Sequence, residues 1–139
     1  MARFYMGIAR DVAKHELAVK KPACVIAGGE TTVTLRGSGK GGRNQEMALS
    51  FLAEVEADPD GSSGIWFLAA STDGNDGPTD AAGAFADPEI LAAGKAAGLE
   101  IQEYLAANDS YHYFDKIGFL CKTGPTNTNV CDVQLTVIK

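Results

Sequence analysis

Glycines, two cations and four polar side chains gather in the stretch GSGKGGRNQE, residues 37–46, which leads into a helical pattern. A glycine backbone can approach a bound anion closely, and amide groups at a helix N-terminus favour negative charge. Lysine adds a mobile cation and arginine a fork-shaped one. The stretch predicts an anion-binding loop or, equally well on physical grounds, a solvated flexible loop with a helix cap. The residues of this candidate anion site are Gly39, Lys40, Gly41, Gly42 and Arg43.

A dinucleotide fingerprint is formally present in the same stretch, because Gly37, Gly39 and Gly42 match G-x-G-x-x-G. The preceding pattern is a hairpin rather than the first strand of a βαβ unit, and the acidic residue expected about 20 residues further on falls in a turn. A Walker A loop is excluded because no Gly-Lys-Ser/Thr triplet opens the helix. The spacing therefore argues against a dinucleotide site.

Three aspartates, Asp73, Asp76 and Asp80, directly follow the apolar run GIWFLAAS. Ligand sites in open α/β sheets lie at the carboxyl ends of strands. Carboxylates placed there can hold Mg²⁺ or accept a proton from a hydroxyl group. The alternative is that the Asp-Gly and Gly-Pro pairs of this stretch simply form turns.

The stretch KTGPTNTNVCD, residues 122–132, offers adaptable hydrogen-bonding groups, among them Thr126, Asn127 and Asn129. They precede a C-terminal strand pattern, so they could line a cleft or form Asx turns that only shape the loop. The two histidines are isolated and the three cysteines lack CxxC spacing, which argues against a zinc site.

Alternating and 3.6-residue patterns predict the elements that must position these loops. Gly28 and Gly29 would join the first two strands as a hairpin. The mixture of elements predicts one α/β domain over residues 1–139, a layered α/β/α arrangement around a mixed β-sheet. In chain order the expected elements are helix 3–19, strands 23–28 and 31–36, helix 44–57, strand 64–71, helices 87–98, 99–109 and 110–118, and strands 118–124 and 130–139.

The composition is that of an ordinary globular chain, with 45% apolar and 22% charged residues. The net charge of -6 argues against nucleic acid or an anionic membrane as the main partner, although local cations still permit a small anionic ligand. No apolar run reaches the roughly 18–20 residues that span a bilayer, and the N-terminus lacks a signal-peptide pattern. With an odd number of cysteines, which we expect to be reduced, the chain is expected in the cytoplasm.

Four blocks in a fixed order carry a resemblance to a known family. They are GGETTVTLRGSGKGGRNQEMAL, STDGNDGPTDAAGA, LAANDSYHYF and KTGPTNTNVCDV. They resemble the C-terminal domain of the glycerate 2-kinase family, a domain called MOFRL, and many members carry the name hydroxypyruvate reductase. The resemblance runs from about Ala9 to Lys139, with residues 1–21 as an N-terminal helix and 22–139 as the α/β core.

The resemblance implies transfer of a phosphoryl group from ATP to D-glycerate, giving 2-phosphoglycerate, with a divalent metal such as Mg²⁺. Complete family members have two α/β domains around a shared cleft, and the larger, Rossmann-like N-terminal domain is not found in this chain. We therefore expect the chain to be inactive alone and to need that domain in cis or in trans. The alternatives are a free-standing interaction module, for which a homodimer is an option, and a part of a hydroxypyruvate reductase, although no complete nicotinamide site is found.

Carried over residue by residue, the resemblance places Arg43 in the cleft, where a guanidinium can bind the substrate carboxylate or the charge developing on the transferred phosphoryl group. It makes Asp73 and Asp76 the expected catalytic carboxylates, and both together with Asp80 the expected metal ligands. The further residues implied in substrate or phosphate binding are Gly39, Lys40, Gly41, Gly42, Asn44, Gln45, Glu46, Thr79, Asp80, Thr126, Asn127 and Asn129.

Overall fold

The computed structural model describes residues 1–16 and 19–139, in which strands and helices follow one another along the chain. In this part of the chain no helix has the length and apolar character needed to cross a membrane. The elements are α1 (Ala2–His15), β1 (Ala23–Gly29), α2 (Arg43–Ala57), the 3-10 turn η1 (Asp60–Ser62), β2 (Ile65–Ser71), β3 (Gly83–Ala86), α3 (Pro88–Ala96), α4 (Ile101–Ala107), α5 (Ser110–Ile117), β4 (Leu120–Cys121) and β5 (Asp132–Ile138).

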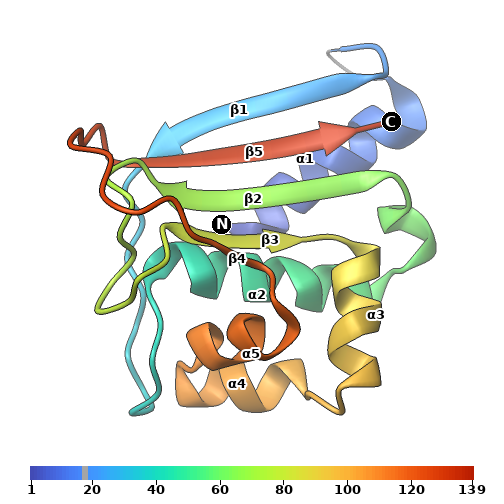
Figure 1. Cartoon of the computed structure of the whole chain (residues 1–139). Helices are drawn as coiled ribbons and strands as arrows, with labels where there is room; N and C mark the ends of the chain where they lie inside the picture. Colours follow the sequence, from blue (N-terminus) through green and yellow to red (C-terminus); the bar gives the residue numbers. More distant parts are fainter. Residues whose placement is uncertain (17–18) are drawn as a thin grey trace.

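The five strands form one sheet in the order β1-β5-β2-β3-β4 (Figure 1). The α/β class expected from the sequence is confirmed. Within it, every strand pair described is antiparallel, so the expected mixture of strand directions is not found. The reason is that the last strand, β5, inserts between β1 and β2 and runs opposite to both.

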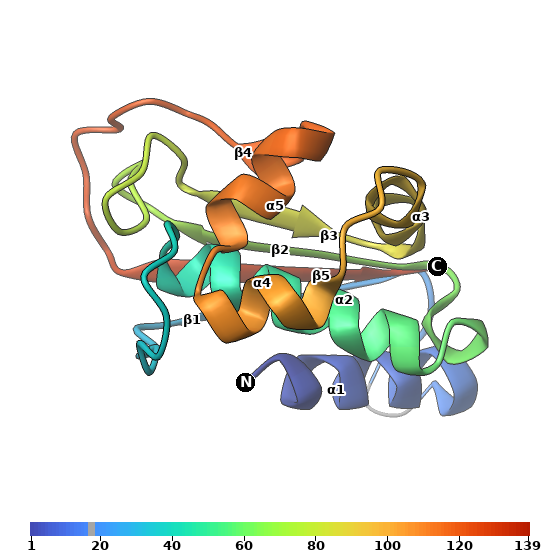
Figure 2. The ribbon, with the colours of Figure 1, turned by 90° about the horizontal axis from the view of Figure 1, so that it is seen from below.

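One face of the sheet is covered by α1 and α2, and the core lies between these helices and the strands (Figures 1 and 2). Phe51 of α2 stacks on Phe67 of β2 with ring centroids 4.3 Å apart, and both side chains are buried. Helices α3, α4 and α5 gather beneath the β3 and β4 edge of the sheet (Figure 1). No described helix crosses the opposite face of β1, β5 and β2, so the expected second helical layer is not present in the described residues.

Strand β5 reverses the usual pattern of a sheet that is covered on one face. Asp132, Gln134 and Thr136 point to the covered side and are buried, as does Ile138 at the end of the strand, whereas Val133, Leu135 and Val137 alternate to the other face, where Val137 is 37% exposed. The hydroxyl group of Tyr5 in α1 donates a 3.1 Å hydrogen bond to Gln134 Oε1. Alternation in the sequence predicts a strand here, but it does not show which face is covered.

The N-terminal helix is shorter than predicted. It ends at His15 because Glu16 takes a left-handed backbone conformation with φ 50°, which stops the helical hydrogen bonds. Of the predicted helix 3–19, residues 17–18 lie outside the described residues. In this helix Tyr5 and Met6 are buried, whereas Phe4 is 59% exposed.

The predicted hairpin of strands 23–28 and 31–36 is wrong. Strand β1 pairs with β5, and residues 31–36 form no strand. Asn108, at the end of α4, holds this segment instead. Its side-chain oxygen accepts hydrogen bonds from the backbone amides of Arg36 (2.6 Å) and Gly37 (2.9 Å). A long-range contact from α4 therefore outweighs the strand propensity of the β-branched residues.

Strand β3 is missing from the sequence prediction, because the small residues GAFA give little alternation to detect. The predicted strand 118–124 shrinks to Leu120–Cys121. The predicted helices over 44–57, 87–98, 99–109 and 110–118 and the strands over 23–28, 64–71 and 130–139 are confirmed to within a few residues at their ends.

Candidate functional site

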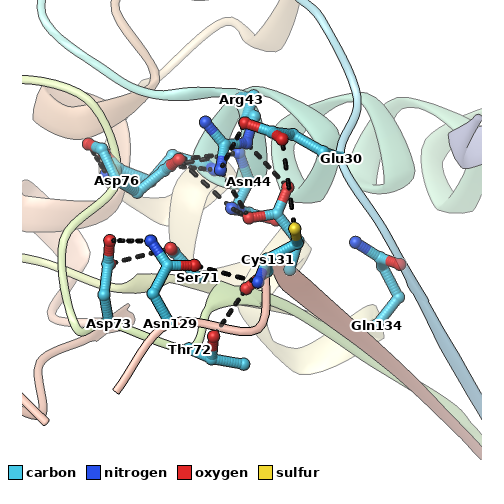
Figure 3. A network of polar contacts seen from close by, with 12 residues as sticks. Glu30, Arg43, Asn44, Ser71, Thr72, Asp73, Asp76, Asn129, Cys131 and Gln134 are labelled. Atoms are coloured by element: carbon cyan, nitrogen blue, oxygen red, sulfur yellow. Dashed lines mark hydrogen bonds and ion pairs between the residues drawn. The ribbon is translucent and has the colours of Figure 1, made fainter. Parts of the chain in front are cut away.

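The predicted site residues converge at one end of the sheet. Ser71 ends β2 and Asp132 begins β5, and the two are directly paired across the strands. Arg43 is the first residue of α2 and reaches this end from the covered face. Figure 3 shows the polar contacts that link these residues to Asp73 and Asp76. Sheet register and the start of one helix thus bring the three sequence blocks together.

The guanidinium group of Arg43 is held by Asp132. Its Nε and Nη2 atoms donate to the two carboxylate oxygens at 2.7 and 2.9 Å, and the Asp132 side chain is fully buried. This hydrogen bond is the main reason that the pKa of Arg43 is raised further above its ordinary value. Glu30 lies 3.6 Å from Nη2 and is largely exposed. The cation therefore has one firmly bound buried partner and one exposed partner that a ligand could replace.

Asp76 fills the position that an anion would take at the start of α2. Its carboxylate accepts from the backbone amides of Asn44 (3.1 Å) and Gln45 (2.9 Å), and the residue is buried. Burial raises the pKa of Asp76, while the hydrogen bonds from Gln45 and Asn44 oppose that shift. The carboxylate of Asp76 thus satisfies the free N–H groups of the helix.

Asn44 and Gln45 link the residues of this network by hydrogen bonds. Both are fully buried, so they do not face an open cleft. Asn44 Nδ2 donates to Asp132 at 3.0 Å and to Asp76 at 3.2 Å. Gln45 Nε2 donates to Thr79 Oγ1 at 2.8 Å. The predicted residues Asn44, Gln45 and Thr79 are therefore brought together, with Asp76 and Asp132 as the acceptors that position them.

The glycine-rich loop packs tightly against its neighbours. A Cβ atom at Gly42 would overlap the carboxyl group of Asp76, and one at Gly41 would overlap the Ser110 hydroxyl group. Gly77, on the facing loop, has φ +62°, a left-handed conformation that suits glycine. Close packing against Asp76 and α5 accounts for Gly42 and Gly41, and the anion-binding role of the loop stays a prediction.

Asp73 lies in the second loop, where it is tied to neighbouring polar groups. Its carboxylate accepts from the Ser71 hydroxyl group (2.8 Å), the Asn75 amide (2.9 Å) and Asn129 Nδ2 (3.2 Å). The Asn75 amide is the main cause of the lowered pKa of Asp73. The backbone amide of Thr126 donates to the Asp73 carbonyl oxygen at 3.1 Å. Thr126 and Asn129 thus hold the two loops together, an arrangement that fits both the cleft-lining and the loop-shaping interpretations.

The third predicted polar residue of this stretch, Asn127, takes a left-handed backbone conformation with φ 59°. Its side chain is exposed. Asparagine tolerates this conformation better than most residues, which explains its place in the turn.

A second, more exposed cluster surrounds Tyr111 of α5. Its hydroxyl group donates to Asp80 at 2.7 Å, and Lys122 pairs with the same carboxylate at 3.0 Å. The Tyr111 hydrogen bond is the main cause of the lowered pKa of Asp80. The Lys40 ammonium group lies over the Tyr111 ring, 3.9 Å from its centroid. Lys40 and Asp80 are thus brought together, with Tyr111 between them.

The three predicted metal ligands do not form one site. Asp76 is buried under the helix amides, Asp73 lies with Asn129, and Asp80 lies with Tyr111. Over the described ranges 1–16 and 19–139, no group of three or more His, Cys, Asp or Glu residues is placed to hold a metal ion. The expectation of a joint site is corrected because each carboxylate is already bound by different neighbours.

A groove of about 550 Å³ runs from Arg43 along α2 between the start of α1, α4 and the segment 31–36. Glu46 lines it, and burial raises the pKa of this carboxyl group, which accepts a 2.9 Å hydrogen bond from Asn108. Arg36 adds a second cation to the wall. Arg43 thus lines one end of this groove.

Sequence reasoning misses Asp132, Glu30, Tyr111 and Lys122 as members of the site. Asp132 stands at the start of a strand pattern, where a charged residue suggests only an exposed strand end. A useful signal is the alternation of Asp132 with Gln134, which places both on one face. Their partners are far away in the sequence, so only the sheet register reveals the contacts with α2.

The family model for the MOFRL family matches residues 23–132, most of the chain. The D-glycerate 2-kinase of Thermotoga maritima is 46% identical over 136 residues, which cover 98% of this chain and 32% of the relative. The human glycerate kinase is 48% identical over 121 residues, covering 85% of this chain and 23% of the relative. A protein of Agrobacterium vitis named as a hydroxypyruvate reductase is 44% identical, covering 99% of this chain and 31% of the relative.

Solved structures agree with these matches. The crystal structure of the Thermotoga maritima glycerate kinase superposes with a TM-score of 0.92 at 44% identity, covering 99% of this chain and 32% of that one. A protein of Pyrococcus horikoshii superposes with a TM-score of 0.88 at 36% identity, covering 99% of this chain and 31% of that one. The chain thus spans about a third of the length of these relatives or less. The family match and the full-length superposition together establish that this chain belongs to the MOFRL family.

Proposed function

We propose that this chain supplies one wall of the active site of an ATP-dependent glycerate 2-kinase, with the other wall supplied by a larger partner domain in cis or in trans. The observation that carries the proposal is the 46% identity to a D-glycerate 2-kinase along 98% of this chain. Because the chain corresponds to only 32% of that relative, we expect it to be inactive alone. The proposed reaction transfers a phosphoryl group from ATP to D-glycerate, giving 2-phosphoglycerate.

Arg43 is the residue that we assign to the anionic groups of the reactants. Asp132 fixes its Nε and Nη2 edge, so the orientation of the guanidinium is set before a ligand arrives. Glu30 is an exposed partner at 3.6 Å, and such pairs contribute little, so the substrate carboxylate or the phosphoryl group can replace it. A preorganised cation of this kind suits phosphoryl transfer, in which positioning and charge neutralisation dominate.

The carboxylates divide into two roles in this proposal. Asp73 and Asp80 have lowered pKa values and accessible surroundings, so they fit a divalent cation or a substrate hydroxyl group. Asp76 does not fit as a ligand, because its oxygens accept from the amides that start α2. When bound together with the nucleotide, Mg²⁺ would neutralise phosphate charge, and it usually needs only one or two protein carboxylates. Lys40, Thr126 and Asn129 are proposed as further cleft residues.

A reductase function receives less support from this geometry. The loop that matches G-x-G-x-x-G does not follow a strand, because residues 31–36 form none. The amides at the start of α2, where a dinucleotide pyrophosphate would bind, donate to Asp76. We therefore prefer phosphoryl transfer. The free-standing interaction module is the second candidate, and the open apolar face of the sheet is the observation that favours it.

The decisive assay is ADP release from Mg-ATP with D-glycerate, measured on this chain alone and on a hybrid enzyme. In the hybrid, this chain replaces the matching third of the Thermotoga maritima kinase. Turnover by the hybrid but not by the chain alone supports the shared site, and turnover by the chain alone contradicts it. In an active hybrid, Arg43→Ala should lower kcat/KM by at least about a hundredfold. An Arg43→Ala hybrid with full activity would remove Arg43 from the mechanism.

A further inference from the structure

No described helix crosses the face of β1, β5 and β2 that is turned away from α1 and α2 (Figure 1). Several apolar side chains on this face are exposed. On this face Ile26 is 71% exposed, Phe85 is 41% exposed and Val137 is 37% exposed. Strand register places these side chains next to further apolar ones, so the patch is continuous across four strands. We call the whole set the open sheet face; its members are Cys24, Ile26, Trp66, Leu68, Phe85, Val133, Leu135 and Val137.

The open sheet face carries no charged side chain among its eight members. Lys139 lies at its rim, with the ammonium group 5.0 Å from the centre of the Trp66 ring. Single exposed apolar residues are ordinary on a protein surface, but a continuous uncharged patch marks a surface that another molecule covers. Depletion of charge at the centre is typical of stable interfaces.

The residue pattern of β5 also indicates that another molecule covers this face. The polar residues Asp132, Gln134 and Thr136 of β5 lie on the helix-covered side with Ile138, and its other apolar residues, Val133, Leu135 and Val137, face outward. A sheet whose outer face remains in water has the opposite alternation, with polar residues outside. The sequence of β5 therefore fits a strand that is buried on both sides, and the structure of this chain provides the cover for one side.

We propose that the open sheet face is the docking surface for the larger remaining portion of a glycerate kinase. That portion would contact the face with an apolar, uncharged surface of its own. The inference rests on the proposed function, in which that portion completes the site. The chain covers only 31–32% of the length of the Thermotoga maritima and Agrobacterium vitis relatives. The remaining portion of such a protein is therefore large enough to cover the face. The same strands lead to the site, because Gly29 and Ser71 pair with Asp132 at the end of the face. A domain seated here would lie beside the end of the sheet at which Arg43 contacts Asp132.

Thiol labelling tests the proposal, because Cys24 is an exposed cysteine on this face. In the chain alone, a maleimide reagent should label Cys24 at the rate of a free surface thiol. In the hybrid with the Thermotoga maritima kinase, labelling should slow by at least about tenfold, because reagent access then requires local opening. Peptide mass spectrometry separates Cys24 from Cys121 and Cys131. Equal rates in the chain and in the hybrid would overturn the proposal.

A matched pair of substitutions shows whether the face itself is responsible. Ile26→Lys places a charge on the open sheet face, and Phe4→Lys places one on a comparably exposed position of α1. In the hybrid, Ile26→Lys should restore fast labelling of Cys24, whereas Phe4→Lys should leave it slow. Slow labelling in both variants would overturn the proposal. Neither change should alter the urea unfolding of the chain alone, since both side chains are mostly in water.

Two further measurements keep the proposal falsifiable if the hybrid fails to fold. The complete Thermotoga maritima kinase with a cysteine at the position aligned with Cys24 should label slowly, and fast labelling would overturn the proposal. Light scattering on the chain alone should give a monomer. A dimer that Ile26→Lys dissociates would assign the face to a second copy instead. Activity is a separate readout: an active hybrid with fast Cys24 labelling refutes only the docking surface, and an inactive hybrid with slow labelling refutes only the proposed chemistry.

Discussion

Asp76 and Asp80 belong to the same loop between β2 and β3, yet the fold gives them opposite surroundings. Asp76 is buried at the start of α2, where burial raises its pKa against several hydrogen bonds. Asp80 is exposed beside Tyr111 and Lys122, which lower its pKa. The first carboxylate holds the architecture of the site, and the second remains accessible to a ligand. Residue type and spacing alone would assign both the same role.

Removing the buried carboxylate should have the largest effect on stability. Asp76→Ala leaves the amides of Asn44 and Gln45 without their acceptor at the start of α2. We expect a loss of about 3 kcal/mol in the free energy of unfolding, from the lost helix cap and the unsatisfied buried donors. Urea denaturation of the chain measures it. Asp80→Ala is the matched control, and an equal loss in both variants would show that burial does not separate the two sites.

Breaking the Arg43–Asp132 pair should cause the next largest loss in the free energy of unfolding. Asp132→Ala removes a buried partner of a guanidinium that is still partly exposed, so we expect a loss of about 2 kcal/mol, below that of a fully buried pair. The double variant with Arg43→Ala should lose less than the sum of the two single variants, by about 1–2 kcal/mol. Additive losses in urea denaturation would mean that the two side chains are not coupled in solution.

The pH dependence of stability should have opposite signs in the two regions. The raised pKa of Asp76 means that the folded state binds its proton more tightly, so wild type should gain stability relative to Asp76→Asn as the pH falls through that raised value. The lowered pKa of Asp80 means that its contribution is present at neutral pH. It is lost as the pH falls below the ordinary range. Thermal unfolding of wild type, Asp76→Asn and Asp80→Asn between pH 7 and about pH 2.5 gives both trends. Parallel pH trends would contradict the assignment.

The smallest expected effect is a change in the pKa of Asp80 within the exposed cluster around Tyr111. Tyr111→Phe removes the hydrogen bond that is the main cause of the lowered pKa of Asp80, so that pKa should rise towards its ordinary value. Lys122→Met should raise it less, because the Lys122 contact is the second cause. NMR titration of the Asp80 carboxyl carbon measures both. A larger shift in Lys122→Met than in Tyr111→Phe would reverse the order of the two contacts.

Much of the secondary structure could be predicted from local patterns. Helix α2 is confirmed because its apolar residues recur at helical spacing, and strand β2 because it is a continuous apolar run of strand length. The segment 31–36 and strand β3 could not be predicted, since the first is held by Asn108 from α4 and the second has too few large residues. The structure brings together the blocks around Arg43, Asp76 and Thr126, and their roles in catalysis stay predictions.

The sequence by itself determined the α/β class and the family, because composition, period and motifs can be read directly along the chain. Only the tertiary structure decided that Asp132 holds Arg43, that Asp76 caps α2, and that the sheet has one open apolar face. The physical reason is sheet register. Inserting β5 between β1 and β2 brings Asp132 opposite Ser71 and turns the apolar side of β5 outward, and no local pattern in the sequence encodes that pairing.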